Sequence, residues 1–152
     1  MLGNEEEIIF TATDLLADTK LAPELSNEAH YYRAKAYLDA GKTDGAMEDL
    51  KILAKDTRNV YGAEAKYKVA QIYFDGGQTD KAEQEVLNYI EVSTPHTYWL
   101  ARSFVLLADV YMKLGRNLDA KQYLLSLKQN YQADDDIAGM IESRLEKLKT
   151  EN

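Results

Sequence analysis

The sequence predicts an all-α protein built from repeated pairs of helices, and three observations predict it. Three segments of the 152-residue chain align with one another without a gap over their central positions. Apolar residues recur at intervals of three and four residues, which is the period of a helix. Only two prolines are present, and a glycine follows the first helical stretch of each aligned segment. A fixed arrangement of helix, tight turn and helix explains all three observations.

The first predicted element is a helix from Glu5 to Lys20. Its apolar residues lie at helical spacing: Ile8, Ile9, Ala12, Leu15 and Leu16. Acidic residues in its first turn suit the positive end of the helix dipole. We interpret residues 1–26 as part of an incomplete preceding unit, with this helix as its second helix. Pro23 and the pair Ser26-Asn27 then mark the break and the cap of the next helix.

Three full units follow, which we place at residues 27–62, 63–100 and 101–136. Each contains a small residue, a tyrosine, a glycine, a polar residue and an alanine at the same spacing. The tyrosines are Tyr37, Tyr73 and Tyr111, and they repeat at 36 and 38 residues. Agreement at five positions in three segments is strong evidence for a true repeat. Thr94-Pro95 is interpreted as a helix start, with threonine as the cap and proline in the first helical position.

Each unit is expected to fold as two helices joined by a tight turn. A glycine ends the first helix because a left-handed residue is needed there: Gly41, Gly77 and Gly115. A polar residue two positions later is expected to cap the second helix: Thr43, Thr79 and Asn117. The second helices carry apolar stripes: Ala46, Leu50 and Leu53; Ala82, Val86 and Tyr89; Ala120, Leu124 and Leu127. Alanines are expected where the paired helices approach most closely: Ala34 and Ala46, Ala70 and Ala82, Ala108 and Ala120.

The last predicted element is a closing helix over residues 137–152. The run Asp134-Asp135-Asp136 precedes it and is interpreted as its N-terminal cap rather than as part of a calcium loop, which would need a glycine and a distant glutamate. Its apolar residues again have helical spacing: Ile137, Met140, Ile141, Leu145 and Leu148. Lys147 and Lys149 lie in its final turn, where cations are favourable. A repeat array needs such a polar-faced end.

These residues resemble the tetratricopeptide repeat, a helix–turn–helix unit of about 34 residues. The resemblance covers Asn27 to about Asp136 and implies a right-handed α–α superhelix with a protein or peptide partner. The units are longer than usual, and in this respect they are similar to repeats of large bacterial cell-envelope proteins. The stretch from Thr94 to Phe104 is similar to C-terminal repeats of those proteins. The resemblance therefore implies a periplasmic or envelope location. Because the array opens within a unit, we expect this chain to be the C-terminal part of a larger protein.

Composition excludes several classes of function. The net charge of −8 argues against a general nucleic-acid-binding surface, which needs clustered lysine and arginine. The absence of cysteine excludes disulfides, thiolate catalysis and cysteine-type zinc sites. Residues 1–7 lack the basic head and apolar middle of a signal peptide. The apolar stretches, such as residues 104–108, are too short to span a bilayer, so we expect no membrane insertion.

No constellation of catalytic residues is recognisable. His30 and His96 are placed at the starts of two first helices, in different units, and are not spaced as metal ligands. The serines lack the motif of a hydrolase nucleophile, and Gly76-Gly77 is not followed by the lysine of a phosphate-binding loop. We therefore predict neither an enzyme nor a cofactor or metal site. Tyr98 and Trp99 are assigned to packing between units.

The leading hypothesis for function is a protein–protein interaction scaffold. In such arrays the first helices line the concave surface. After the packing positions are removed, one stripe of these helices remains, with aromatic side chains among mixed charges that suit a peptide segment. The candidate partner-binding residues are Tyr31, Lys35, Tyr67, Gln71, Phe74, Arg102, Val105 and Asp109. The alternative is a purely structural or oligomerising repeat module with no separate ligand.

Overall fold

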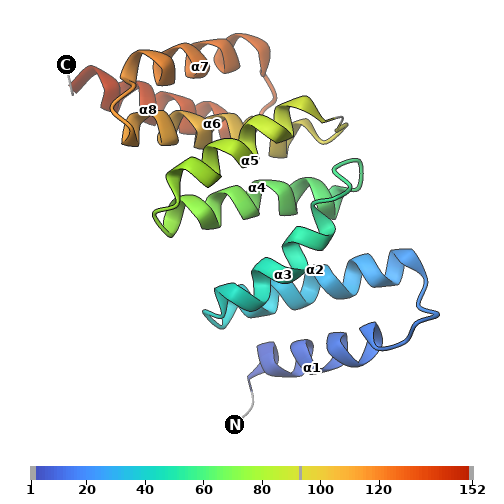
Figure 1. Cartoon of the computed structure of the whole chain (residues 1–152). Helices are drawn as coiled ribbons and strands as arrows, with labels where there is room; N and C mark the ends of the chain where they lie inside the picture. Colours follow the sequence, from blue (N-terminus) through green and yellow to red (C-terminus); the bar gives the residue numbers. More distant parts are fainter. Residues whose placement is uncertain (1–2, 93, 151–152) are drawn as a thin grey trace.

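The chain folds into a stack of helices (Figure 1). The structure is a computed structural model, and it describes residues 3–92 and 94–150. This described part contains eight helices and no strand. The helices are α1 (Asn4–Leu16), α2 (Pro23–Asp39), α3 (Thr43–Leu53), α4 (Val60–Asp75), α5 (Thr79–Glu91), α6 (Thr97–Lys113), α7 (Asn117–Asn130) and α8 (Ile137–Thr150). The predicted all-α helical-repeat superhelix is confirmed.

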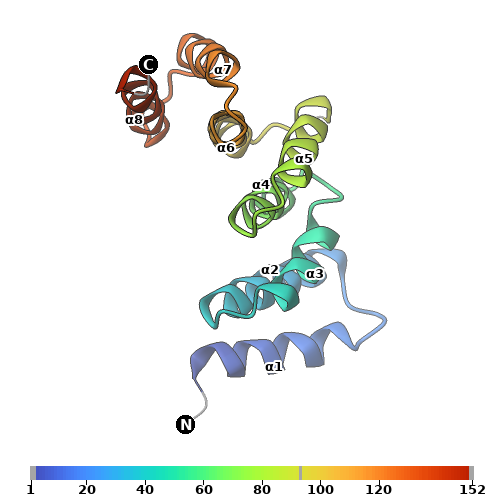
Figure 2. The same cartoon turned by 60° about the vertical axis from the view of Figure 1, so that its left-hand side comes forward.

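Three helix–turn–helix pairs form the body of the stack: α2 with α3, α4 with α5, and α6 with α7. The first helices also contact one another in sequence, α2 to α4, α4 to α6 and α6 to α8. Each second helix instead packs against the first helix of its own pair and the first helix that follows. Figure 2 shows the stack bending, with α4, α6 and α8 along the inner side and α5 and α7 along the outer side. The first helices therefore line one continuous inner surface.

The three predicted glycine turns are confirmed. Gly41, Gly77 and Gly115 have φ values of 74°, 79° and 77°, in the left-handed region that favours glycine. At the first turn, the Lys42 amide donates to the Tyr37 carbonyl at 2.8 Å and the Gly41 amide donates to the Leu38 carbonyl at 3.1 Å. The other two turns repeat these bonds at equivalent positions. This pair of bonds is the Schellman motif, which satisfies the last carbonyls of a helix.

The predicted side-chain caps of the second helices are wrong. Thr43, Thr79 and Asn117 are the first residues of α3, α5 and α7, and the capping position belongs to the residue before each of them. Those preceding residues, which are Lys42, Gln78 and Arg116, make no side-chain capping hydrogen bond. Each turn glycine is followed directly by the capping residue of the next helix. The threonine or asparagine two positions after the glycine therefore already lies inside that helix.

Several helix ends also differ from those predicted. Helix α1 ends at Leu16 and not at Lys20. Helix α2 begins at Pro23, ahead of Ser26-Asn27, because proline is favourable in the first helical position. As a result His30 lies within α2 and not at its start. Helix α6 begins at Thr97, and the Thr94 hydroxyl accepts a hydrogen bond from the His96 amide in the turn before it.

The predicted apolar stripes form the core. All nine stripe residues of α3, α5 and α7 are buried, and the paired alanines are at most 1% exposed. Most of the buried hydrophobic residues form two clusters, one over α2, α3 and α4 and a larger one from α4 to α8. Tyr73 of α4 packs against both clusters. Helix α4 is therefore the element through which the two halves of the core are joined.

Helix α8 closes the stack as predicted. Ile137, Ile141 and Leu148 are buried in the larger cluster, and Met140 and Leu145 pack against it. The Asp135 carboxylate accepts a hydrogen bond from the Ile137 amide at 2.9 Å, so one residue of the acidic run satisfies an amide at this helix start. Residues 151–152, which the sequence placed in this helix, lie outside the described residues.

Candidate functional site

The eight candidate residues lie on three consecutive first helices. Tyr31 and Lys35 are on α2, Tyr67, Gln71 and Phe74 are on α4, and Arg102, Val105 and Asp109 are on α6. Most of them are at least partly exposed, but Val105 is 2% exposed and belongs to the larger core cluster. Tyr67 is also mostly buried, with 7% of its surface exposed. The stripe is therefore an inner surface on which most residues are accessible, while Val105 and Tyr67 are buried and belong to the core.

Tyr31 links α2 to α4 at the N-terminal end of this surface. Its hydroxyl donates to the Glu64 carboxylate at 3.1 Å, and its ring lies 4.4 Å from that of Tyr61. Lys68 pairs with the same carboxylate at 2.6 Å. Burial, followed by the charge of Glu64, raises the pKa of Tyr31 to about 12. Tyr31 therefore remains a neutral hydrogen-bond donor at neutral pH and holds the two helices together.

An aromatic cluster with one cation occupies the centre of the surface. The Arg102 guanidinium lies 5.0 Å from the centre of the Tyr67 ring and 5.7 Å from that of the Trp99 ring, within cation–π range. Its Nη1 donates to the Tyr98 hydroxyl at 3.3 Å. Its Nε is buried without a hydrogen-bond partner among the described residues. Burial lowers the pKa of Arg102, but the neighbouring Tyr67 and Tyr98 outweigh this effect and the pKa is raised.

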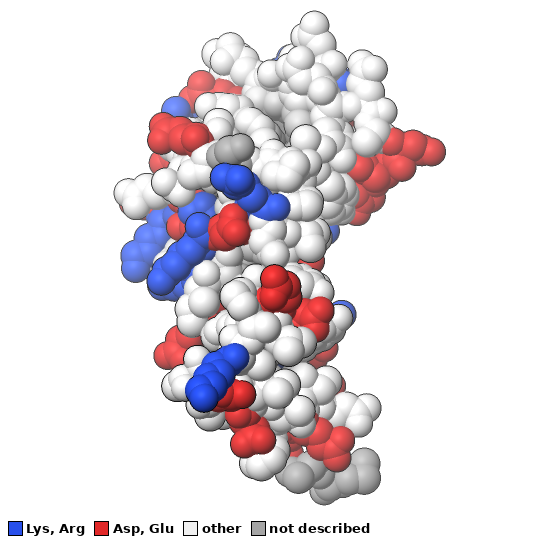
Figure 3. All heavy atoms as spheres, turned by 90° about the vertical axis from the view of Figure 1, so that its right-hand side faces the viewer, with Lys and Arg blue, Asp and Glu red and all other residues white. Residues whose placement is uncertain are grey.

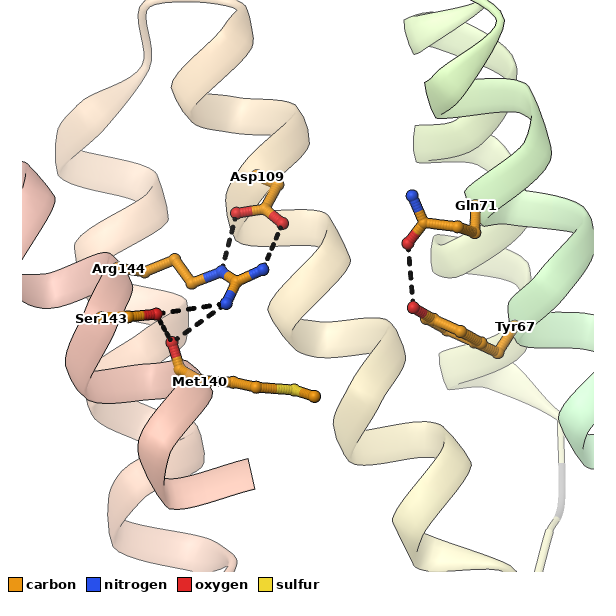
Figure 4. Close-up of polar contacts among 6 residues, drawn as sticks. All are labelled: Tyr67, Gln71, Asp109, Met140, Ser143 and Arg144. Atoms are coloured by element: carbon orange, nitrogen blue, oxygen red, sulfur yellow. Dashed lines mark hydrogen bonds and ion pairs between the residues drawn. The ribbon is translucent and has the colours of Figure 1, made fainter. Parts of the chain in front are cut away.

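Tyr67 and Gln71 lie across from an ion pair at the C-terminal end of the surface (Figure 4). The Tyr67 hydroxyl donates to the Gln71 side-chain oxygen at 2.9 Å. On α6 the Asp109 carboxylate receives two hydrogen bonds from Arg144 of α8, each 3.1 Å long. Such a two-point contact fixes the orientation of both side chains. Arg144 thus continues the inner surface from α6 onto α8.

A groove lies between the ends of α4, α6 and α8. Its volume is about 660 Å³, and its lining residues are Phe74, Asp109, Met112, Lys113, Ser143, Arg144 and Lys147. Three of these carry positive charge and one carries negative charge. Phe74 and Asp109 belong to the predicted inner stripe, whereas no residue of α8 was predicted as part of a site. The spacing of Ser143, Arg144 and Lys147, which puts all three on one face of α8, is the sequence signal for this contribution.

Both histidines are hydrogen-bonded structural residues. His30 contacts the buried Asp49 at 2.8 Å, and His96 contacts the Arg58 carbonyl at 3.0 Å. In the described ranges, no three His, Cys, Asp or Glu side chains are grouped so that they could hold a metal ion. The same ranges contain no helix with the length and apolarity needed to cross a membrane. On the face shown in Figure 3, lysine and arginine form no continuous band and are interspersed with acidic residues.

Comparison with known families supports the identity of the repeats. Two sequence models described as tetratricopeptide repeat match the chain, one over residues 28–56 and the other over residues 101–130. Both matches support the tetratricopeptide repeat family. They cover α2 with α3 and α6 with α7, two of the three helix pairs. No curated protein and no solved structure matches the chain. Tetratricopeptide repeats generally mediate protein–protein interaction and are typically non-enzymatic scaffolds.

Proposed function

We propose that this chain is a non-enzymatic interaction scaffold whose inner surface binds a segment of a partner protein. The observation that carries the proposal is the convergence of side chains from three helices on one surface. Lys35 of α2, Gln71 of α4 and Arg102 of α6 are at least partly exposed there, beside the packed rings of Tyr67 and Trp99. Aromatic side chains and arginine are enriched at protein interfaces, where they anchor apolar and polar parts of a partner.

The surface is ordered by its own contacts before a partner arrives. Tyr31 is held by Glu64, Gln71 by Tyr67 and Asp75, and Arg102 by the rings on either side of it. A surface ordered in this way loses little side-chain entropy when it binds. Val105 is left out of the proposed contact set because it is buried in the core. Val105 instead packs in the larger core cluster and thereby stabilises the position of α6.

Affinity capture with matched variants tests this function. Lys35→Glu with Gln71→Lys changes two accessible positions of the inner surface and leaves the buried Tyr67 in place. Lys121→Glu with Gln122→Lys makes the same exchanges on exposed positions of the outer helix α7. We expect the inner variant to lose at least tenfold in recovery of partner proteins, and the outer variant to match the wild type. Equal recovery by both variants, with unchanged circular dichroism, would contradict the proposal.

We also propose that the chain belongs to a larger bacterial cell-envelope protein. The long units of 36 and 38 residues support this proposal, since similar lengths occur in the envelope proteins that the repeats resemble. An immunoblot of fractionated cells gives both size and compartment, and a product of 152 residues found only in the cytoplasm would contradict both parts.

A further inference from the structure

The groove between α4, α6 and α8 has an excess of positive charge in a chain whose net charge is −8. Arg144 is neutralised by Asp109, whereas Lys113 and Lys147 make no ion pair with any described residue. Both lysines are exposed, and beside them lie the partly buried side chains of Phe74 and Met112. The groove therefore presents two uncompensated cations around an apolar floor. An occupant that suits it carries an apolar side chain flanked by carboxylates.

Helix α1 presents a surface of this description. Phe10 is 75% exposed, the highest value among the large hydrophobic residues described. Glu6 precedes Phe10 by four residues and Asp14 follows it by four, so that the three side chains lie along one face of α1. This face, which we call the acidic stripe, points away from α2, since Ala12 is the residue of α1 that is buried. Neither Glu6 nor Asp14 forms an ion pair within the described part of the chain.

We propose that the acidic stripe of one copy docks in the basic groove of a second copy. Phe10 inserts against Phe74 and Met112, and the carboxylates of Glu6 and Asp14 approach Lys113 and Lys147. The contact is complementary in charge and in apolar character, which gives it its specificity. The net charge of the chain does not prevent it, because at physiological salt charges beyond about 8 Å are screened.

This contact joins two different surfaces and therefore does not close by itself. The stripe lies at one end of the stack and the groove at the other, so each docked copy still offers one free stripe and one free groove. Such a head-to-tail contact produces open chains unless its rotation closes a ring. A single helix in a groove buries less surface than a stable dimer needs, so the assembly is weak and reversible. Its strength falls as salt rises.

The groove shares Phe74 and Asp109 with the candidate partner-binding residues, but the tests of the two proposals use different residues. Partner binding by the inner surface is tested at Lys35 and Gln71, which do not line the groove between α4, α6 and α8. The two proposals can therefore fail separately. Loss of partner capture leaves self-association unchanged, and loss of self-association leaves partner capture unchanged.

Sedimentation velocity tests the docking by comparing the full wild-type chain with variants in which the charges of the groove, of the acidic stripe or of both are reversed. The wild type should show a weight-average mass that rises with concentration and does so less at high salt. Lys113→Glu with Lys147→Glu should abolish this rise, and so should Glu6→Lys with Asp14→Lys. The variant that combines all four substitutions restores opposite charges across the contact and should associate again. Phe10→Ser, which removes the apolar anchor, should weaken the association at least tenfold.

A control separates local complementarity from net charge. Lys42→Glu with Lys121→Glu makes the same charge change at exposed positions outside the groove and should associate like the wild type. All the exchanged positions are exposed, and circular dichroism verifies that each variant is folded. A wild type that stays monomeric at all concentrations overturns the proposal and leaves the groove to a segment of another protein. Failure of the fourfold variant to regain association also overturns it.

Discussion

Gly62 is required for its lack of a side chain rather than for an unusual backbone angle. It lies in the first turn of α4, directly above the loop that joins α3 to α4. A Cβ atom at this position would overlap the backbone oxygen of Asp56 and would lie 2.6 Å from that of Leu53. Backbone oxygens cannot rotate away as a side chain could. Gly62 could not be identified from the sequence, because the need for it arises from a loop whose path the periodicity does not define.

We expect Gly62→Ala to lower the free energy of unfolding by about 1–3 kcal/mol, the usual cost of forcing extra volume into a packed site. Gly139→Ala is the matched control, since Gly139 lies in α8 with open space where the Cβ would be. Alanine is the better helix former, so the control should gain up to about 1 kcal/mol. Urea denaturation of both variants measures the difference. Equal effects of the two substitutions would show that the α3–α4 loop moves freely away from α4.

At the scale of the element, the sequence predicts most where one residue alone determines the geometry. The turns after α2, α4 and α6 were predicted correctly because only glycine adopts a left-handed angle at little cost. The side-chain caps were predicted wrongly because a cap depends on the register between the turn and the next helix. The stripes of the second helices were predicted correctly because each is flanked by two first helices and must bury the same face repeatedly.

The close approach of α4 and α5 gives a test at this scale. Ala82 of α5 is fully buried, so a larger side chain there must push the paired helices apart. We expect Ala82→Trp to cost about 1–3 kcal/mol or more in the free energy of unfolding. Gln84→Trp places the same ring on an exposed position of the same helix and should change stability by less than about 0.5 kcal/mol. Thermal unfolding that is unchanged in both variants would contradict the packing of these helices.

At the scale of the whole molecule, the neighbours of each first helix determine which inner residues stay accessible. Helix α6 packs against α4, α5, α7 and α8, whereas α2 has fewer helices around it. This difference explains why Val105 of α6 is buried while Tyr31, at the equivalent position of α2, is partly exposed, although the same pattern predicted both as surface residues. The contribution of α8 to the groove was missed for a related reason. A closing helix breaks the repeat, so repeat alignment carries no information about its faces.

The same uneven packing predicts an uneven distribution of local stability. A repeat array is stabilised by contacts between neighbours, so its parts can open separately. Helix α1 has one buried residue, Ala12, and among the described helices it packs only on α2, whereas α6 has eight buried residues. Amide hydrogen exchange should therefore be slowest in α6, intermediate in α2 and α3, and fastest in α1.

Two identical substitutions, one in each core cluster, separate this gradient from a single cooperative unfolding. Leu50 belongs to the cluster over α2, α3 and α4, and Leu107 to the cluster from α4 to α8. Either leucine-to-alanine change should cost about 2–5 kcal/mol in its own cluster. Leu50→Ala should accelerate exchange mainly in α2 and α3, and Leu107→Ala mainly in α6 and α7. Equal acceleration of all the helices by both variants would show that α4 couples the two clusters into one cooperative unit.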